Sequence, residues 1–105
     1  MEIKKPLTKE AWSNVHEKAQ EIGDAWMRDD EIMAGVYVEQ MMEVLDELED
    51  EFGRHAMLVS TRADFMSDDE ERRALYEVAL ILAKEQGDHE EVEEILDSLR
   101  EMEKE

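Results

Sequence analysis

The residues whose types and spacing could most readily bind a metal ion lie between positions 87 and 95, in the segment GDHEEVEEI. Its carboxylates recur one helical turn apart, so they could converge on a metal ion. The same residues also fit a helix boundary, because Gly87 suits a C-terminal cap and Asp88 suits an N-cap. Glu91 would then complete a capping box with Asp88. Since this structural explanation needs no ligand, a metal site requires matching residues elsewhere in the chain.

Part of this segment, EEVEE at residues 90–94, resembles the first carboxylate motif of the MazG-like all-α nucleotide pyrophosphohydrolases. The resemblance implies a second Glu-x-x-Asp on a following helix, where further oxygens would hold magnesium. The pairs Glu43–Asp46 and Glu47–Asp50 have that spacing, but they precede EEVEE and so reverse the family order. A MazG-like pyrophosphohydrolase is therefore the least favoured alternative, and we expect no enzyme, no metal and no cofactor.

The other residues that commonly carry catalysis do not form a recognisable motif. A di-iron bundle would need Glu-x-x-His pairs, whereas the residues three before His16, His55 and His89 are Ser13, Phe52 and Gln86. The sequence contains no glycine-rich phosphate loop, calcium loop or Ser-His-Asp context. GDHEEVEEI is accordingly predicted to be a turn followed by a helix start.

Composition and charge indicate the kind of partner. The chain has 105 residues, of which 42% are hydrophobic, enough for a single domain with one modest core. It holds 31 acidic and 12 basic residues, a formal net charge of -19, which disfavours direct nucleic-acid binding and favours a basic protein or peptide as partner. Residues 29–53 alone contain ten acidic residues and no basic one.

The sequence contains no cysteine and no apolar run of the roughly 18 residues that a membrane span needs. We therefore expect a cytoplasmic protein that does not bind membranes. The oligomeric state is left open, and a homodimer is compatible with the sequence.

Apolar spacing predicts five antiparallel helices in a single helical domain, residues 1–105, with residues 1–8 as an N-terminal tail. Helix one is expected over residues 9–27, with Thr8 as its N-cap and an apolar face of Trp12, Val15, Ala19, Ile22 and Trp26. Helix two starts at Asp29 or Asp30 and ends at Gly53. A shorter helix follows within residues 55–66. Ser67 and Glu70 are predicted to form a capping box for helix four, and helix five follows Gly87.

Two segments resemble tetratricopeptide repeats. EAWSNVHEKAQEIGD, residues 10–24, is similar to the first helix of such a repeat, with matches at Trp12, Val15, Gly23 and Asp24. ERRALYEVALILAKEQGD, residues 71–88, resembles the second helix of an extended repeat. The implied period is 44 residues, longer than the usual period of about 34, and helix five would be a terminal cap. The fold is thus expected to be tetratricopeptide-like hairpins, or else a simple helical bundle.

This resemblance implies a protein-binding groove lined by the first helix of each repeat. The implied partner-binding residues are Glu10, Ser13, Glu17, Gln20 and Glu21 of helix one, Met57, Thr61, Asp64 and Phe65 of helix three, and Glu94, Asp97 and Glu101 of helix five. Because this surface is acidic, an acidic peptide is an unsuitable ligand.

The sequence therefore predicts a non-catalytic protein-interaction module. Its more specific form is an acidic neutraliser of a basic protein, such as an immunity protein, an antitoxin or a dedicated chaperone. The alternative is a nucleic-acid mimic, in which carboxylates replace phosphates on a DNA-binding protein.

Overall fold

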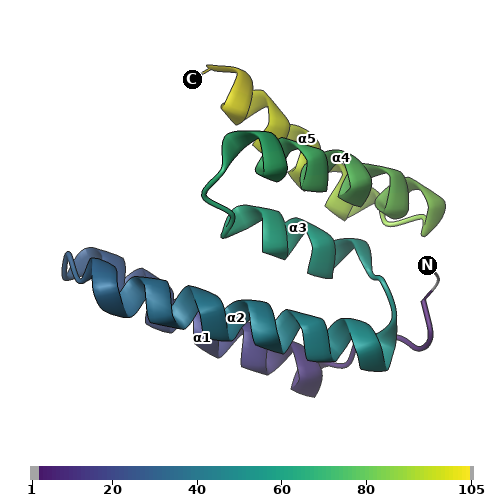
Figure 1. Cartoon of the computed structure of the whole chain (residues 1–105). Coiled ribbons are helices and arrows are strands. Elements are labelled where there is room, and N and C mark those ends of the chain that lie inside the picture. Colours follow the sequence, from purple (N-terminus) through teal and green to yellow (C-terminus); the bar gives the residue numbers. More distant parts are fainter. Residues whose placement is uncertain (1–2, 105) are drawn as a thin grey trace. The chain divides into compact units, whose positions relative to one another are not determined.

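The computed structural model describes residues 3–104, which form five α-helices joined by short turns (Figure 1). The helices are α1 (Lys9–Met27), α2 (Glu31–Phe52), α3 (Ala56–Asp64), α4 (Asp69–Glu85) and α5 (His89–Lys104). Within the described range, β pairing is limited to one isolated bridge between Ile3 and Gly53. The predicted all-α class is confirmed.

Helix packing divides the chain into two compact units, residues 3–53 and residues 54–104. In the first unit α1 packs along α2, and in the second unit α4 packs against both α3 and α5 (Figure 1). Consecutive helices within a unit are antiparallel hairpins, because their connecting turns are short. None of the helices in residues 3–104 has both the length and the apolar composition needed to cross a membrane. The single domain and the tetratricopeptide-like repeat stay predictions.

Side-chain caps fix where the helices begin. The Thr8 hydroxyl accepts a hydrogen bond from the backbone N–H of Ala11 at 3.0 Å, which confirms the predicted N-cap of α1. The predicted capping box of Ser67 is wrong. Helix α4 begins one residue later, and the Asp68 carboxylate accepts the N–H of Glu70 at 3.0 Å. Asp68 therefore satisfies a backbone donor that has no acceptor inside the helix.

Helix α4 ends at Glu85, close to the glycine that the sequence indicates. Gly87 has a φ of 69°, its N–H donates to the carbonyl of Lys84 at 3.2 Å, and the N–H of Asp88 donates to the carbonyl of Ala83 at 2.9 Å. This pair of bonds is the Schellman motif, which places a left-handed residue just after the helix. Asp29 occupies the equivalent position after α1 with a φ of 56°.

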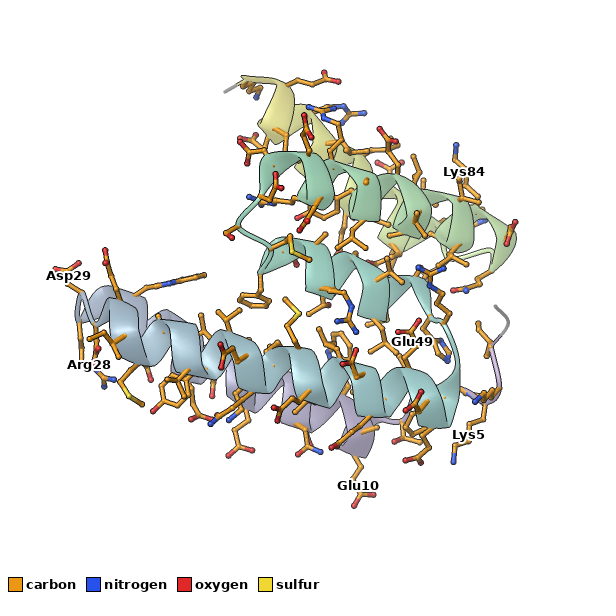
Figure 2. All side chains as sticks on the ribbon, in the orientation of Figure 1. Lys5, Glu10, Arg28, Asp29, Glu49 and Lys84 are labelled. Carbon is orange, nitrogen blue, oxygen red and sulfur yellow. The ribbon has the colours of Figure 1, made fainter. Side chains whose placement is uncertain are left out.

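Residues 3–8 are non-helical, as predicted for a tail, but residues 3–5 are held against the end of α2. The backbone N–H groups of Lys4 and Lys5 donate to the carbonyl of Phe52 at 2.9 and 3.2 Å. The Lys4 ammonium donates to the carbonyl of Asp50 at 2.7 Å, and Lys5 lies 3.0 Å from the Glu51 carboxylate. Figure 2 shows Lys5 near the C-terminal end of α2. The last carbonyls of a helix lack intrahelical donors, and α2 has no basic residue in its last turn. The two lysines supply those donors.

The buried residues of the first unit follow the predicted apolar spacing with one exception. Val15 and Ile22 of α1 are buried, and so are Ala34, Met41, Leu45, Leu48 and Phe52 of α2. Trp26 was expected on the same face but is 54% exposed, and Ala25 is fully buried in its place. Positions three and four after Ile22 lie on either side of the apolar stripe, because the helix repeats every 3.6 residues. In α1 the position three residues after Ile22, which is Ala25, lies on the apolar stripe.

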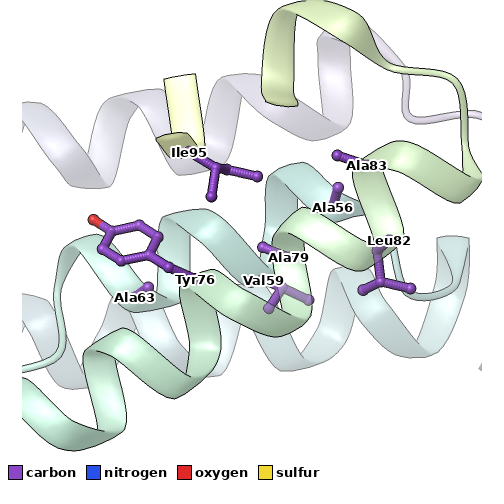
Figure 3. Close-up of a cluster of buried hydrophobic side chains, with 8 residues drawn as sticks. All are labelled: Ala56, Val59, Ala63, Tyr76, Ala79, Leu82, Ala83 and Ile95. Carbon is purple, nitrogen blue, oxygen red and sulfur yellow. The ribbon is translucent and has the colours of Figure 1, made fainter. Parts of the chain in front are cut away.

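The core of the second unit combines small and large side chains (Figure 3). Its buried members are Ala56, Val59, Ala63, Tyr76, Ala79, Leu82, Ala83 and Ile95. The alanines of α3 and α4 lie where the two helices face each other, so the helix axes can approach closely. Tyr76 and Ile95 are only 1% exposed and fill the space between these helices and α5.

We predict opposite effects of alanine at two glycines. Gly23 lies inside α1, and a Cβ atom added there would meet nothing within 4 Å, so Gly23→Ala should stabilise the chain by about 0.5–1 kcal/mol. Gly87 has a positive φ, so Gly87→Ala should destabilise the chain by about 1 kcal/mol. Urea unfolding followed by helical circular dichroism measures both changes. Two changes of the same sign would contradict these helix boundaries.

Candidate functional site

Five predicted binding residues lie on α1 in the first unit: Glu10, Ser13, Glu17, Gln20 and Glu21. The first four are exposed, and Figure 2 shows Glu10 projecting away from the start of the helix. Glu21 is partly buried and lies 3.1 Å from the ammonium group of Lys18. Lys18 also donates to the side-chain oxygen of Gln40 in α2 at 2.8 Å. Glu21 is therefore engaged within its own hairpin.

Four more predicted residues belong to α3 and its end: Met57, Thr61, Asp64 and Phe65. Met57, Thr61 and Phe65 are partly buried. The Thr61 hydroxyl donates to the carbonyl of Met57 at 2.7 Å, one turn earlier in the same helix. Phe65, the predicted apolar anchor, is the C-cap residue of α3. Phe65 therefore lies at the end of α3, one residue after the last helical residue, Asp64.

The three predicted residues of α5, Glu94, Asp97 and Glu101, are exposed. Asp97 and Glu101 lie 2.9 and 3.5 Å from basic groups three residues later, Arg100 and Lys104. Exposed pairs of this kind contribute little stability. Among the predicted residues, the second unit brings Asp64 and Glu94 together, around one small cavity. The residues of α1 belong to the other unit, so a groove that spans both sets stays a prediction.

That cavity has a volume of about 60 Å³ and is lined mainly by polar side chains of α3, α4 and α5. Glu91 is 8% exposed, and its carboxylate accepts a hydrogen bond from the Ser60 hydroxyl at 2.5 Å. The capping box predicted for Glu91 is therefore only half formed. Asp88 accepts the N–H of Glu91 at 3.2 Å, whereas the Glu91 side chain reaches Ser60 and does not return to Asp88. The backbone N–H of Asp88 already donates to Ala83.

A second hydrogen bond in the cavity joins Tyr76 of α4 to Asp64 of α3, with the phenol donating to the carboxylate. The guanidinium of Arg72 lies 5.7 Å from the centre of the Tyr76 ring. Asp64 is exposed as a whole residue, as predicted for a partner-binding position, but its carboxylate is already engaged within the second unit. A buried tyrosine hydroxyl needs such an acceptor, because an unsatisfied polar group in a core is costly.

Burial changes the acid–base properties of the cavity. Loss of water raises the pKa of Glu91, against a smaller opposing effect of the hydrogen bond from Ser60, and nearby Glu94 raises the pKa further. Desolvation likewise raises the pKa of Asp64, although its bond from Tyr76 and the charge of Arg72 lower it. The pKa of Tyr76 is raised by desolvation and then by its bond to Asp64. All three groups are therefore shifted toward their protonated forms.

The cavity has the groups of a catalytic site but not its dimensions. Ser60 is 7% exposed, and a space of about 60 Å³ is far below the roughly 300–1,000 Å³ of typical ligand pockets. In the part of the chain that is described, no three His, Asp or Glu side chains are grouped as a metal ion would require. The hydrogen bonds join α3 to α4 and α5, so their effect is to fix how these helices pack.

Sequence reasoning missed this cluster, although a signal was present. Glu91 precedes Ile95 by four residues and Ser98 by seven, so all three lie on the face of α5 that holds the apolar residues. A carboxylate on an apolar face indicates a buried partner. The position of that partner, 31 residues earlier at Ser60, has no signature in the local sequence.

A broader acidic surface lies on α2. Four exposed carboxylates, Glu39, Glu43, Glu47 and Asp50, recur at steps of three and four and so share one helical face, here called the acidic stripe. At the end of α2, Glu47 and Glu51 line a hollow of about 310 Å³ together with Glu10 of α1. Leu48 and Phe52 contribute apolar surface to the same hollow. This surface contains one predicted binding residue, Glu10.

Comparison with known proteins identifies no relative: the chain matches no family model, no curated protein and no solved structure.

We predict that Glu91→Gln stabilises the chain at neutral pH. A carboxyl group whose folded-state pKa is raised contributes full stability only below its ordinary value of 4.5, and this contribution is lost as the pH rises through the raised value. Glutamine keeps a hydrogen-bonding group at Ser60 without the buried charge. The melting temperature of Glu91→Gln should therefore exceed that of wild type at pH 7, and the difference should shrink toward pH 4.5.

Glu90→Gln provides the control, because Glu90 is an exposed carboxylate one residue away. It removes the same charge without changing the cavity. Equal melting temperatures of the two variants at every pH would show that the carboxylate of Glu91 carries no burial cost.

Proposed function

We propose that this chain is a non-catalytic interaction module that binds a basic protein. The observation that carries this proposal is the surface of α2. Residues 29–53 include ten acidic and no basic residues, and four of the carboxylates form the exposed acidic stripe. Like charges on one face repel each other, so they lower the stability of the folded chain unless positive charge lies opposite.

A basic partner would supply that positive charge. Complementary charge accelerates association and selects against acidic competitors, which suits a protein that must capture a basic partner quickly. An immunity protein, an antitoxin or a dedicated chaperone would use its surface in this way. The polar cavity of the second unit is too small for a substrate and contributes rigidity, which agrees with a binding role.

The proposal predicts a partner with a basic surface and strongly salt-dependent binding. The chain should be immobilised, exposed to soluble protein from its source cells at about 0.15 M salt, and the retained proteins identified by mass spectrometry. The purified partner should bind with an association rate that falls about tenfold or more as sodium chloride rises toward 1 M. The activity of the partner should be blocked when the partner is bound to this chain.

Two outcomes would contradict the proposal. Retention of several DNA-binding proteins, each released by added duplex DNA, would indicate nucleic-acid mimicry. If no basic protein binds while the melting temperature rises steeply with salt, the acidic surplus serves solubility at high ionic strength.

A further inference from the structure

We infer that the exposed face of α2 is a docking surface for a basic amphipathic helix of the partner, with apolar residues at one end of that helix and Lys or Arg along the rest. This inference rests on the proposed function. It adds where the partner binds, which is α2, and what kind of partner segment binds there, which is a basic helix. It differs from the groove of α1, α3 and α5 that the repeat resemblance implies.

The face is continuous along most of α2. Ile32 and Val36 precede the acidic stripe at the same steps of three and four, so residues 32, 36, 39, 43, 47 and 50 lie along one side of the helix. All six residues are exposed. At 1.5 Å per residue the face is about 27 Å long, the length of a partner helix of about 20 residues.

The N-terminal end of this face is apolar and exposed in the described part of the chain. Ile32 is 82% exposed and Val36 is 39% exposed, and Met27, just before the turn, is 86% exposed. Burial in a core therefore does not explain why these positions carry apolar side chains. Helix propensity does not explain them either, because Ile and Val form helices less readily than Glu or Lys. Two apolar residues one turn apart are neighbours on a helix surface, and they gain free energy when a partner covers them.

Gly35 lies between these two apolar residues and is also exposed. A Cβ atom added there would meet nothing within 4 Å, so no contact with the residues that the structure describes requires a glycine at this position. Glycine inside a helix is destabilising relative to alanine. Its missing side chain does, however, leave room for another backbone or a bulky side chain to approach α2 beside Ile32, which lies one turn before Gly35.

The negative charge of the α2 face favours a basic helix over a second copy of this chain. A second copy of this chain would place its own acidic stripe, and the acidic turn of Asp29, Asp30 and Glu31, against identical groups. A basic helix instead matches the stripe at every turn, because Lys or Arg at steps of three and four repeats with the same period as the carboxylates. An amphipathic helix against a helical surface is an established mode of recognition.

The test uses two synthetic helical peptides of about 20 residues, the length that spans this face. In the patterned peptide, Lys and Arg follow one face and two Leu lie one turn apart at one end. The scrambled peptide has the same composition without a common face. Wild-type chain should bind the patterned peptide about tenfold more tightly than the scrambled one in fluorescence anisotropy at about 0.15 M salt.

Matched variants then locate the site. Ile32→Gln combined with Val36→Gln should weaken binding of the patterned peptide about tenfold, mainly through faster dissociation. Glu43→Gln with Glu47→Gln should slow its association, whereas Glu17→Gln with Glu94→Gln, which removes the same charge from α1 and α5, should have a much smaller effect. Each variant must keep the helical circular dichroism of wild type.

Glycine substitutions separate docking from stability. Gly35→Ala and Gly23→Ala should both raise the melting temperature, because each replaces a glycine inside a helix. Only Gly35→Ala should weaken binding of the patterned peptide, because its methyl group would fill the space beside Ile32. Equal binding by the two variants would contradict close approach at Gly35.

Other outcomes overturn the inference while the proposed function stands. Loss of peptide binding in the Glu17 and Glu94 variant, with normal binding in both α2 variants, would place the site in the predicted groove. A wild-type dimer in sedimentation that Ile32→Gln dissociates would identify a second copy as the occupant. If the Ile32 and Val36 methyl groups resist a soluble paramagnetic agent in the free monomer, another part of the same chain covers them. Failure of wild type to bind any basic peptide or protein would instead remove the proposed function itself.

Discussion

Repulsion among carboxylates is the constraint that every part of this structure has to accommodate. With 31 acidic and 12 basic residues, the chain cannot neutralise its own charge by internal ion pairs. Stability must come from apolar stripes buried between antiparallel helices, and the carboxylates must stay in water. Each unit therefore combines a narrow apolar core with a wide acidic surface. The main departure is the polar cavity of the second unit, where Glu91 is buried beside Ser60 at a cost in desolvation.

Three of the basic residues connect segments of the first unit. Lys4 and Lys5 donate to the last carbonyls of α2, and Lys18 joins α1 to α2 through Gln40. In these places a lysine satisfies acceptors at a helix end or links two helices. Residues 29–53 contain no lysine or arginine. The same distribution that holds the hairpin together thus leaves one long helix face acidic, and this is the face that we propose for a basic partner.

The polar cavity and the docking surface that we propose belong to different units of the chain. The cavity of Ser60, Tyr76 and Glu91 connects three helices but offers no room for a ligand, so it explains how α5 is fixed against α3 and α4. On the exposed face of α2, by contrast, the apolar side chains of Ile32 and Val36 are 82% and 39% exposed. A surface of that kind on a rigid helix is suited to recognition, since little conformational entropy is lost when a partner docks on it.

The sequence by itself determined the helices. Apolar residues at steps of three and four, the Thr8 cap and the Gly87 turn are local features that act within one or two turns, so they could be located without the fold.

The tertiary structure alone decided which side chains meet. Glu91 could cap its own helix or reach Ser60, 31 residues away, and the packing of α5 on α3 selected the second contact. Ala25 is buried instead of Trp26 for a similar reason, because both lie beside the same stripe and only the neighbouring helix distinguishes them. Interactions between segments depend on how the helices are placed, and a pattern within one helix does not encode that placement.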